Sequence, residues 1–127
     1  MPDSVRPSTV VIGQGYVGLP LAVRAAETAY DVVGFDVDKT KVDMLANGES
    51  PVEDISDERL AAVLSAGHYR PTTDPGELSD FDVAVISVPT PLREGAPDLS
   101  YIEDAARTLA VHLRAGACVV LESTTYP

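Results

Sequence analysis

Residues 9–18 of the 127-residue chain read TVVIGQGYVG, and this stretch gives the strongest indication of its fold. Residues 9–12 are a β-branched run that Gly13 closes, a pattern that predicts a short buried strand. Residues 16–28 are apolar on nearly every side, which predicts a helix packed between a sheet and another layer. The segment is therefore expected to form a strand, a glycine-rich turn and a helix.

The turn itself has the spacing G-x-G-x-x-G, with glycines at Gly13, Gly15 and Gly18. In this setting Gly13 permits the tight turn, Gly15 lets a pyrophosphate approach the backbone, and Gly18 lets the helix pack close to the strand. Free N–H groups and the helix dipole then hold the phosphate charge. The motif predicts a dinucleotide site; the alternative is a glycine-rich turn without a ligand.

Asp36 follows the next predicted strand and lies 18 residues beyond Gly18. An acid near this distance accepts hydrogen bonds from the adenosine ribose hydroxyls and repels the extra phosphate of NADP, so the expected cofactor is NAD. The alternative is that Asp36 is a loop residue or a helix cap. Lys39 and Lys41 complicate the choice between NAD and NADP, because either can pair with a 2′-phosphate. Lys41 is expected either to lie over the adenosine half of the cofactor or to be a solvated surface residue.

Strand and helix patterns alternate along the rest of the chain. The alternation predicts an α/β protein of the Rossmann type, a three-layer α/β/α fold with a doubly wound parallel sheet in the order 3-2-1-4-5. Residues 1–8 are expected to be a loose tail, and residues 9–127 one dinucleotide-binding domain. The further strands are expected at 31–35, 69–72, 83–88 and 118–122, and the further helices at 38–47, 56–66 and 98–113.

Two loops follow strands whose carboxyl ends meet at the ligand edge of such a sheet. Pro89 and Pro91 stiffen the first loop around Thr90, so it is expected to form one wall of a cofactor cleft; the alternative is a rigid turn. The second loop carries Ser123 and Thr124, whose hydroxyls are suited to a ribose, a carboxamide or a catalytic water. Hydroxyl clusters also form ordinary turns.

Composition excludes several classes of function. The net charge of −11 opposes binding to nucleic acid or anionic membranes, and no apolar run is long enough to span a bilayer. The single cysteine, Cys118, allows no intrachain disulfide and no cysteine metal cluster, and it is expected to pack inside an apolar strand. The two histidines lack ligand spacing, so no metal site is expected. A reducing cytoplasm fits this cysteine usage.

Taken together, these segments resemble the UDP-glucose/GDP-mannose dehydrogenase family, the nucleotide-sugar 6-dehydrogenases. The resemblance runs from about Thr9 to Pro127 and rests on five stretches in order: VVIGQGYVGLPLA, GFDVDKTKVDMLANGESPVED, SVPTPL, PDLSYIEDA and VVLESTTYP. It implies oxidation of a sugar C6 alcohol to a carboxylate with two NAD+. The residues around 50–54 and 97–102 look closer to the UDP-N-acetylhexosamine branch than to other branches.

The resemblance also implies roles for individual residues. By analogy, Asp36 and Lys41 hold the adenosine half, and Thr124 is associated with a water near the reacting carbon. The resemblance places the pyrophosphate and the nicotinamide against two further sets of residues: Gly13, Gly15, Tyr16, Val17 and Gly18 for the first, and Pro89, Thr90, Ser123 and Thr124 for the second.

The family's nucleophilic cysteine, its lysine and the nucleotide-sugar pocket lie C-terminal to the region that this chain resembles, and Cys118 does not match the nucleophile. The chain is therefore expected to be the cofactor-binding portion, inactive as a dehydrogenase by itself. The family's dimer is built largely by segments outside the resemblance, so this portion is compatible with a monomer. The alternative function is a free-standing NAD-sensing regulatory domain, like the ligand-gated domains attached to potassium channels.

Overall fold

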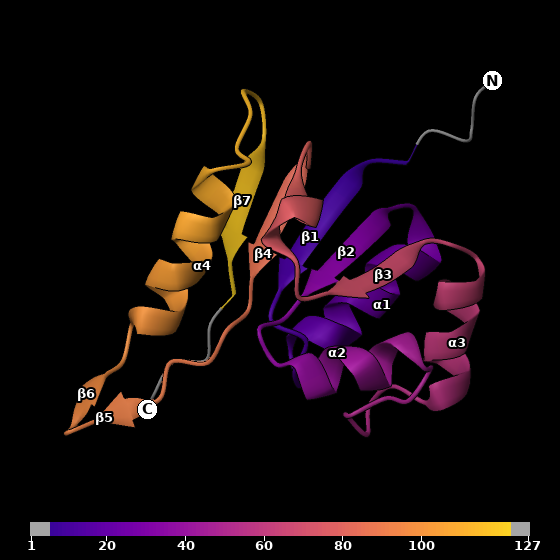
Figure 1. Ribbon diagram of the computed structural model, residues 1–127, viewed down its shortest axis with the longest axis horizontal. Helices are drawn as coiled ribbons and strands as arrows, with labels where there is room; N and C mark the ends of the chain where they lie inside the picture. The colour runs from indigo at the N-terminus through magenta and orange to yellow at the C-terminus, as the bar shows by residue number, and fades with distance from the viewer. Residues whose placement is uncertain (1–5, 123–127) are drawn as a thin grey trace.

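The computed structural model describes residues 6–122 and contains one five-stranded parallel sheet (Figure 1). The strand order is β3-β2-β1-β4-β7, which confirms the doubly wound order expected from the sequence, with β7 as the fifth strand of this sheet. The strands are β1 (Ser8–Ile12), β2 (Asp31–Phe35), β3 (Tyr69–Thr72), β4 (Val83–Ile86) and β7 (Cys118–Leu121).

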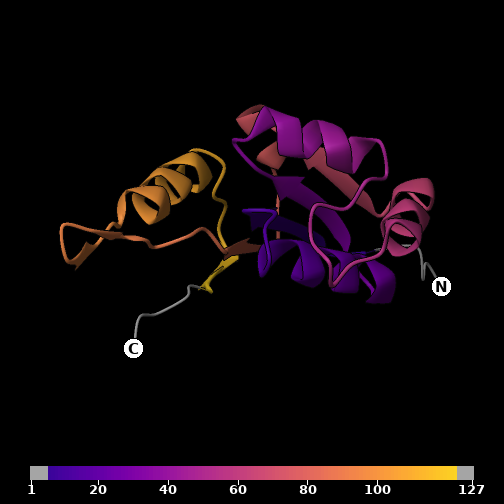
Figure 2. The ribbon, with the colours of Figure 1, turned by 90° about the horizontal axis from the view of Figure 1, so that it is seen from below.

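Helices cover both faces of the sheet (Figure 2). Helices α1 and α3 bury their apolar sides against alternate strand residues such as Val11 and Val85, and α2 adds Leu45 to the same cluster. The other cluster joins Val10, Ile12 and Ile86 to α4 and to a short 3₁₀ turn. The elements concerned are α1 (Gly18–Thr28), α2 (Lys39–Ala46), α3 (Asp57–Ser65), the turn η1 (Pro75–Leu78) and α4 (Ser100–Ala110).

Side-chain caps begin two of the helices where the sequence predicts them. Asp38 accepts a hydrogen bond from the Lys41 N–H at 3.2 Å, and Ser56 accepts one from the Arg59 N–H at 3.1 Å. Each cap satisfies an N–H that the first turn of a helix leaves without a partner.

Helix α4 is shorter than expected. It spans Ser100–Ala110 instead of 98–113, because a two-stranded hairpin, β5 (Leu92–Arg93) and β6 (Ala96–Pro97), precedes it and a turn follows it. Its buried side is formed by Ala105 and Leu109, while Leu99 and Leu113 are exposed. Arg107 pairs with Asp104 at 3.0 Å on the exposed side of the helix.

Strand β7 corrects the expectation for Cys118. The sequence predicts that this cysteine packs inside an apolar strand, but Cys118 and the rest of β7 are exposed. The physical reason is that β7 lies at the edge of the sheet and pairs only with β4, while Ala105 and Leu109 of α4 pack into the cluster of β1 and β4. Among residues 6–122, neither helical layer buries β7.

The first strand begins one residue earlier than expected. Ser8, assigned above to the loose tail, is part of β1 and pairs with Asp31 of β2. Arg6 also has fixed partners, since its guanidinium donates to the carbonyls of Ala26 and Tyr30, both at 2.7 Å. In the part of the chain that the structure describes, no helix is long and apolar enough to cross a membrane.

Candidate cofactor site

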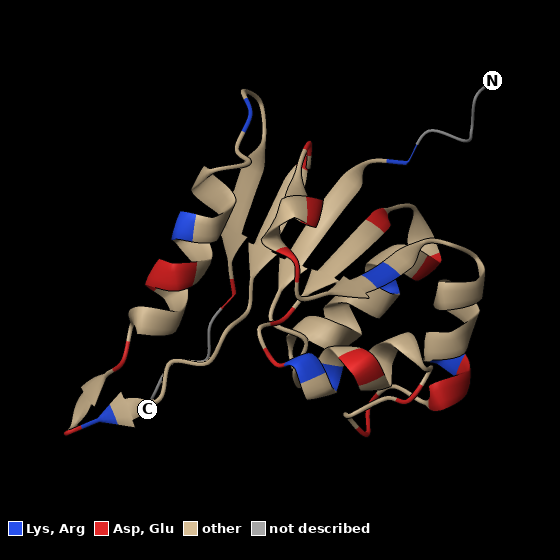
Figure 3. Cartoon of the chain, viewed as in Figure 1, with Lys and Arg blue, Asp and Glu red and all other residues tan. Residues whose placement is uncertain are grey.

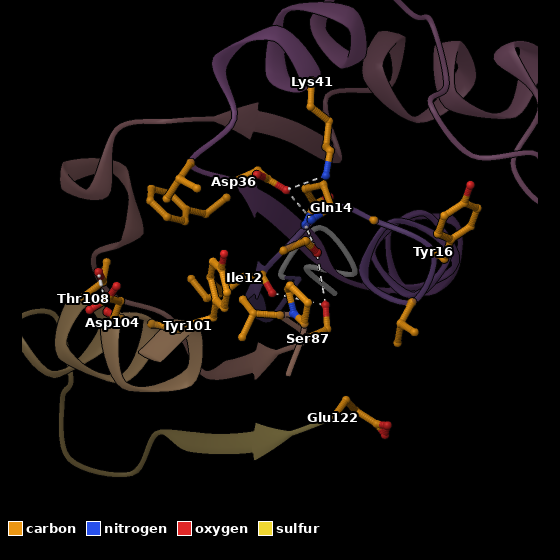
Figure 4. A pocket seen from close by; sticks show the side chains of 18 residues that line it. Ile12, Gln14, Tyr16, Asp36, Lys41, Ser87, Tyr101, Asp104, Thr108 and Glu122 are labelled. Carbon is orange, nitrogen blue, oxygen red and sulfur yellow. Dashed lines mark hydrogen bonds and ion pairs between the residues drawn. The ribbon is translucent and has the colours of Figure 1, made fainter. Parts of the chain in front are cut away.

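A cavity of about 500 Å³ opens at the carboxyl ends of β1, β2 and β4 (Figure 4). Three segments form most of it: the glycine loop after β1, the end of β2 with the start of α2, and the loop after β4. Helix α4 and Glu122 close its remaining sides. The lining residues are Ile12, Gly13, Gln14, Gly15, Tyr16, Val17, Phe35, Asp36, Val37, Lys41, Ser87, Val88, Pro89, Tyr101, Asp104, Ala105, Thr108 and Glu122.

The three glycines of the loop have different surroundings. A Cβ atom on Gly18 would lie 1.7 Å from the Gly13 carbonyl oxygen, and one on Gly13, whose φ is +97°, would lie 2.6 Å from the Ser87 carbonyl oxygen. A Cβ on Gly15 would meet no heavy atom within 4 Å. The loop is therefore packed closely at both ends and open at its centre, where a phosphate group needs to approach the backbone.

The open centre of the loop also offers hydrogen-bond donors. Within residues 6–122, the N–H groups of Gly15, Tyr16 and Val17 donate to no acceptor, and Val17 caps α1 without a side-chain bond. The Ser87 hydroxyl holds the loop from below by donating to the carbonyls of Ile12 at 3.2 Å and Gly13 at 3.1 Å. Unpaired N–H groups at a helix start form an anion site.

Asp36 lies buried beside this loop, directly after β2. Its Oδ2 accepts a hydrogen bond from the Gln14 N–H at 2.8 Å, and its Oδ1 accepts one from the Asp38 N–H at 3.0 Å. Lys41 Nζ is 3.4 Å from Oδ2. An ionised carboxylate accepts about four hydrogen bonds, so these contacts orient the Asp36 side chain and leave capacity for ribose hydroxyls.

Gln14 is fully buried, and sequence reasoning missed it. Its amide nitrogen donates to the carbonyls of Val11 and Gly13, at 2.9 and 3.0 Å, while its Oε1 accepts from the Tyr69 hydroxyl at 2.7 Å. Gly34 makes room for this pair, because a Cβ there would lie 2.5 Å from Gln14 Oε1. Burial, and secondarily the charge of Asp36, raise the pKa of Tyr69 above its ordinary value of 10.0, so the phenol remains a donor.

One wall of the cavity comes from α4, which the sequence pattern did not indicate as part of the site. Tyr101, Asp104, Ala105 and Thr108 line it, at positions i, i+3, i+4 and i+7 of a helix. This spacing was available in the sequence as a face that mixes aromatic, acidic and hydroxyl groups. The spacing alone did not indicate a binding site, because it is the packing of Ala105 onto the sheet that turns this face toward the cavity.

The residues that the sequence assigned to cofactor binding are not all brought together. Gly13, Gly15, Tyr16, Val17, Asp36, Lys41 and Pro89 line the cavity, and Gly18 packs beneath it. Thr90 is buried after β4 and is absent from the lining. Ser123 and Thr124 lie outside the described residues. The roles assigned to these side chains remain predictions.

The charge at the site differs from the charge of the whole chain. Lys41 is the one basic residue among those that line the cavity within residues 6–122, and Asp36, Asp104 and Glu122 are acidic. In Figure 3 the start of α2 is a basic segment beside the carboxyl ends of β1 and β2. The groups that this cavity offers to a phosphate are therefore mainly the backbone N–H groups and the dipole of α1.

The sheet, the close-packed glycine loop and the carboxylate after β2 define a doubly wound dinucleotide-binding domain. The model of the UDP-glucose/GDP-mannose dehydrogenase family, NAD binding domain, matches residues 8–127. The chain belongs to this family, and NAD is the cofactor of the domain.

Individual relatives agree with this assignment. The chain is 42% identical to the UDP-N-acetyl-D-mannosamine dehydrogenase of Pyrococcus horikoshii over 92% of this chain and 28% of that protein. It is 43% identical to an NDP-N-acetyl-D-galactosaminuronic acid dehydrogenase of Ralstonia nicotianae, over 91% of this chain and 27% of that protein. The chain thus spans less than a third of the length of these relatives.

Solved structures show the same fold. The UDP-D-ManNAc dehydrogenase of Pyrococcus horikoshii superposes with a TM-score of 0.88 at 41% identity, over 92% of this chain and 28% of that one. A ternary complex of GDP-mannose dehydrogenase from Pseudomonas aeruginosa superposes with a TM-score of 0.84 at 34% identity, over 94% of this chain and 29% of that one.

Proposed function

We propose that this chain supplies the NAD site of a nucleotide-sugar 6-dehydrogenase, which oxidises the C6 alcohol of a UDP-sugar to the carboxylate with two NAD+. The observation that carries the proposal is the cavity over β1, β2 and β4, with the open backbone at Gly15 and the oriented carboxylate of Asp36. NAD, when bound, supplies the hydride acceptor. The residues of this chain bind it and orient it.

Different groups of the chain bind different parts of NAD. The N–H groups of Gly15, Tyr16 and Val17 hold the pyrophosphate, with Gly13 and Gly18 shaping the loop. Asp36 accepts from the adenosine ribose hydroxyls, and Lys41 holds the carboxylate from the other side. Pro89 lines the cavity on the nicotinamide side, and we assign Thr90, Ser123 and Thr124 to the same side from the family resemblance, with Thr124 as the candidate to hold a water near the reacting carbon.

The substrate we favour is a UDP-N-acetylhexosamine. Relatives named as UDP-N-acetyl-D-mannosamine and NDP-N-acetyl-D-galactosaminuronic acid dehydrogenases are 39–43% identical to this chain. UDP-glucose is the second candidate, since a UDP-glucose dehydrogenase structure from Pyrobaculum islandicum shares 35% identity and a TM-score of 0.85. The family resemblance places the nucleotide-sugar pocket C-terminal to the region that this chain matches.

Calorimetric titration with NADH and NADPH tests the cofactor role of Asp36. Asp36→Ala is expected to lose roughly 1.5–3 kcal/mol of NADH binding free energy, the usual range for hydrogen bonds to a charged group. The difference between the NADH and NADPH affinities is also expected to become smaller. The matched control is Asp31→Ala, which removes the same charge at the opposite end of the same strand. Unchanged affinities for both cofactors in Asp36→Ala would show that this carboxylate has only a structural role.

An absorbance assay at 340 nm tests the assignment of the chain as the cofactor-binding part. We expect no NADH production from UDP-glucose, UDP-N-acetylglucosamine or UDP-N-acetylmannosamine with this chain alone. Aldehyde oxidation needs a nucleophile or an activated water with acid–base partners, and the one thiol, Cys118, is in an edge strand away from the cavity lining. Turnover abolished by Cys118→Ser would contradict this assignment.

A further inference from the structure

We infer that Tyr69 is a positioning residue for cofactor recognition, because through Gln14 it fixes the carboxylate of Asp36 that binds the adenosine ribose. The inference rests on the proposed NAD site and deepens it, since it names the side chains that orient the acid after β2. Tyr69 lies in β3, is 3% exposed and is not among the residues of the described chain that line the cavity. It therefore acts on the cofactor through other residues.

The peptide unit between Gly13 and Gln14 connects the buried side chains to Asp36. Its N–H donates to Asp36 Oδ2 at 2.8 Å, a contact that Figure 4 shows beside the cavity. Its carbonyl oxygen accepts from the Gln14 side-chain amide at 3.0 Å and from the Ser87 hydroxyl at 3.1 Å. Because a peptide unit is planar, holding the carbonyl also fixes the direction of the N–H that binds Asp36.

The side-chain amide of Gln14 is itself held by Tyr69. Its Nε2 donates to the carbonyls of Val11 and Gly13, and its Oε1 accepts from the Tyr69 hydroxyl at 2.7 Å. Turning the amide over would point Oε1 at two carbonyl oxygens, so one orientation satisfies all three contacts. Gln14 is 0% exposed, and a buried acceptor without a donor is costly, so loss of the Tyr69 hydroxyl is expected to displace this amide.

A role in the core alone does not account for Tyr69. Its ring packs in the cluster that contains Val11 and residues of α1 and α3, and a phenylalanine ring would fill the same space. The hydroxyl is used on Gln14 instead. Gly34 of β2 leaves room for both side chains, since a Cβ there would lie 2.5 Å from Gln14 Oε1 and 2.8 Å from Tyr69 Cε1. Two strands and the glycine loop thus meet at this hydrogen bond.

Displacing Asp36 is expected to weaken ribose recognition more than binding of the pyrophosphate. The N–H groups proposed to hold the pyrophosphate belong to Gly15, Tyr16 and Val17, none of which is bonded to the Gln14 side chain or to Tyr69. A carboxylate that binds ribose hydroxyls has to be held within about 0.5 Å of its productive position by the groups behind it. The contribution of Tyr69 is therefore specific to the ribose.

Calorimetric titration with NADH and with an NADH analogue that lacks the 2′-hydroxyl of the adenosine ribose tests the inference. The unmodified chain is expected to bind NADH about tenfold more tightly than the analogue, because that hydroxyl donates to a charged carboxylate. Tyr69→Phe removes one buried hydroxyl and is expected to reduce this ratio to about threefold or less. Both affinities are measured where circular dichroism shows the variant folded, so lower stability alone leaves the ratio unchanged.

Two further variants separate positioning from stability. Val63→Ala truncates a residue of α3 that is 4% exposed in the same cluster as Tyr69, so it lowers stability while the hydrogen-bond partners of Gln14 remain. It is expected to keep the tenfold ratio. Tyr69→Phe combined with Gln14→Met replaces both hydrogen-bonding groups by apolar ones, so it is expected to melt at a higher temperature than Tyr69→Phe and yet keep the reduced ratio.

The outcomes separate this inference from the proposed function. If Tyr69→Phe keeps the ratio of the unmodified chain, Tyr69 only supports the core and the inference is wrong, while the NAD site stands. A ratio that recovers in the double variant, or that falls in Val63→Ala, would show that it follows stability and would also overturn the inference. If the unmodified chain binds NADH and the analogue equally, there is no ribose recognition to position, although NAD binding remains. Failure of the unmodified chain to bind NADH at all would overturn the proposed function, and the inference with it.

Discussion

Strands β1 and β7 have almost the same kind of sequence and opposite surroundings. β1 reads STVVI and β7 reads CVVL, and both are parallel strands rich in valine. Four of the five β1 residues are buried, whereas every residue of β7 is exposed. β1 has neighbours on both sides and a core on both faces, while β7 has one neighbour and no buried face within residues 6–122.

This contrast shows that the burial of a strand depends on its position in the sheet. Apolar parallel strands are expected to be covered on both faces. The half of the molecule around β1 and β2 meets this expectation, and it also carries the glycine loop and Asp36. The β7 edge is not covered in this way. Equivalent substitutions in the two halves are therefore expected to change the free energy of unfolding by different amounts.

The largest expected effect comes from Gly18→Ala, in the well-packed half. The new Cβ would lie 1.7 Å from the Gly13 carbonyl oxygen, so the loop and α1 have to separate, at an expected cost of roughly 3 kcal/mol of unfolding free energy. Urea denaturation measures this cost. Gly15→Ala is the control, because its Cβ meets nothing within 4 Å; it is expected to keep stability but to weaken NADH binding. Equal destabilisation by both variants would contradict the loop geometry.

Val11→Ala and Val120→Ala compare the two strands directly. Val11 is 0% exposed in β1, so removing its two methyl groups is expected to cost about 2 kcal/mol. Val120 is 40% exposed in β7, and its truncation is expected to cost about 0.5 kcal/mol or less. Paired urea melts of the two variants give the difference. A cost at Val120 as large as that at Val11 would mean that β7 is buried in solution.

Tyr69→Phe removes one donor from the buried network of the first half. Gln14 Oε1 then has no donor within the network, which is expected to cost about 1–2 kcal/mol of stability. Thermal unfolding by circular dichroism measures the loss, with Tyr30→Phe as the exposed control. A melting temperature equal to that of the unmodified chain would show that the hydrogen bond contributes no net stability.

The smallest effect is expected at the ion pair between α1 and α3. Arg59 Nη2 lies 2.7 Å from Glu27 Oε1, and the hydrogen bond from Arg59 lowers the pKa of Glu27 below 4.5. A carboxyl group whose pKa is lower in the folded state stabilises the fold at pH values above its ordinary pKa. This contribution disappears as the pH falls through the pKa of the folded state. Glu27→Gln is therefore expected to cost under about 1 kcal/mol at pH 7 and nothing in strong acid.

The matched control for that pair lies in the other half of the molecule. Arg107→Gln breaks the pair with Asp104 on α4, whose side chains are 75% and 74% exposed, and it is expected to leave the unfolding free energy unchanged at every pH. Unfolding curves collected from pH 3 to pH 7 compare the two variants. A constant difference between Glu27→Gln and the unmodified chain across that range would contradict the electrostatic origin of the effect.

Much of the fold and part of the site were predictable from local sequence. The glycine spacing, the acid after β2 and the caps at Asp38 and Ser56 act over a few residues, so their patterns are visible in the chain itself. The hairpin at 92–97 was missed because each of its strands has only two residues, too few for periodicity to show. Gln14 and Ser87 were missed because their partners are brought to them by the sheet.

The order of strands and helices and the glycine loop were predictable from local sequence, and the family was identified from its resemblance to known motifs. The strands, the helices and the loop follow from side-chain periodicity, from the steric freedom of glycine and from capping groups, all of which act between near neighbours. The exposure of Cys118 and the position of Tyr101 in the lining of the cavity result from the packing of distant segments. Burial and pocket lining depend on which elements pack together from distant parts of the chain, and a single stretch of residues carries no information about its eventual neighbours.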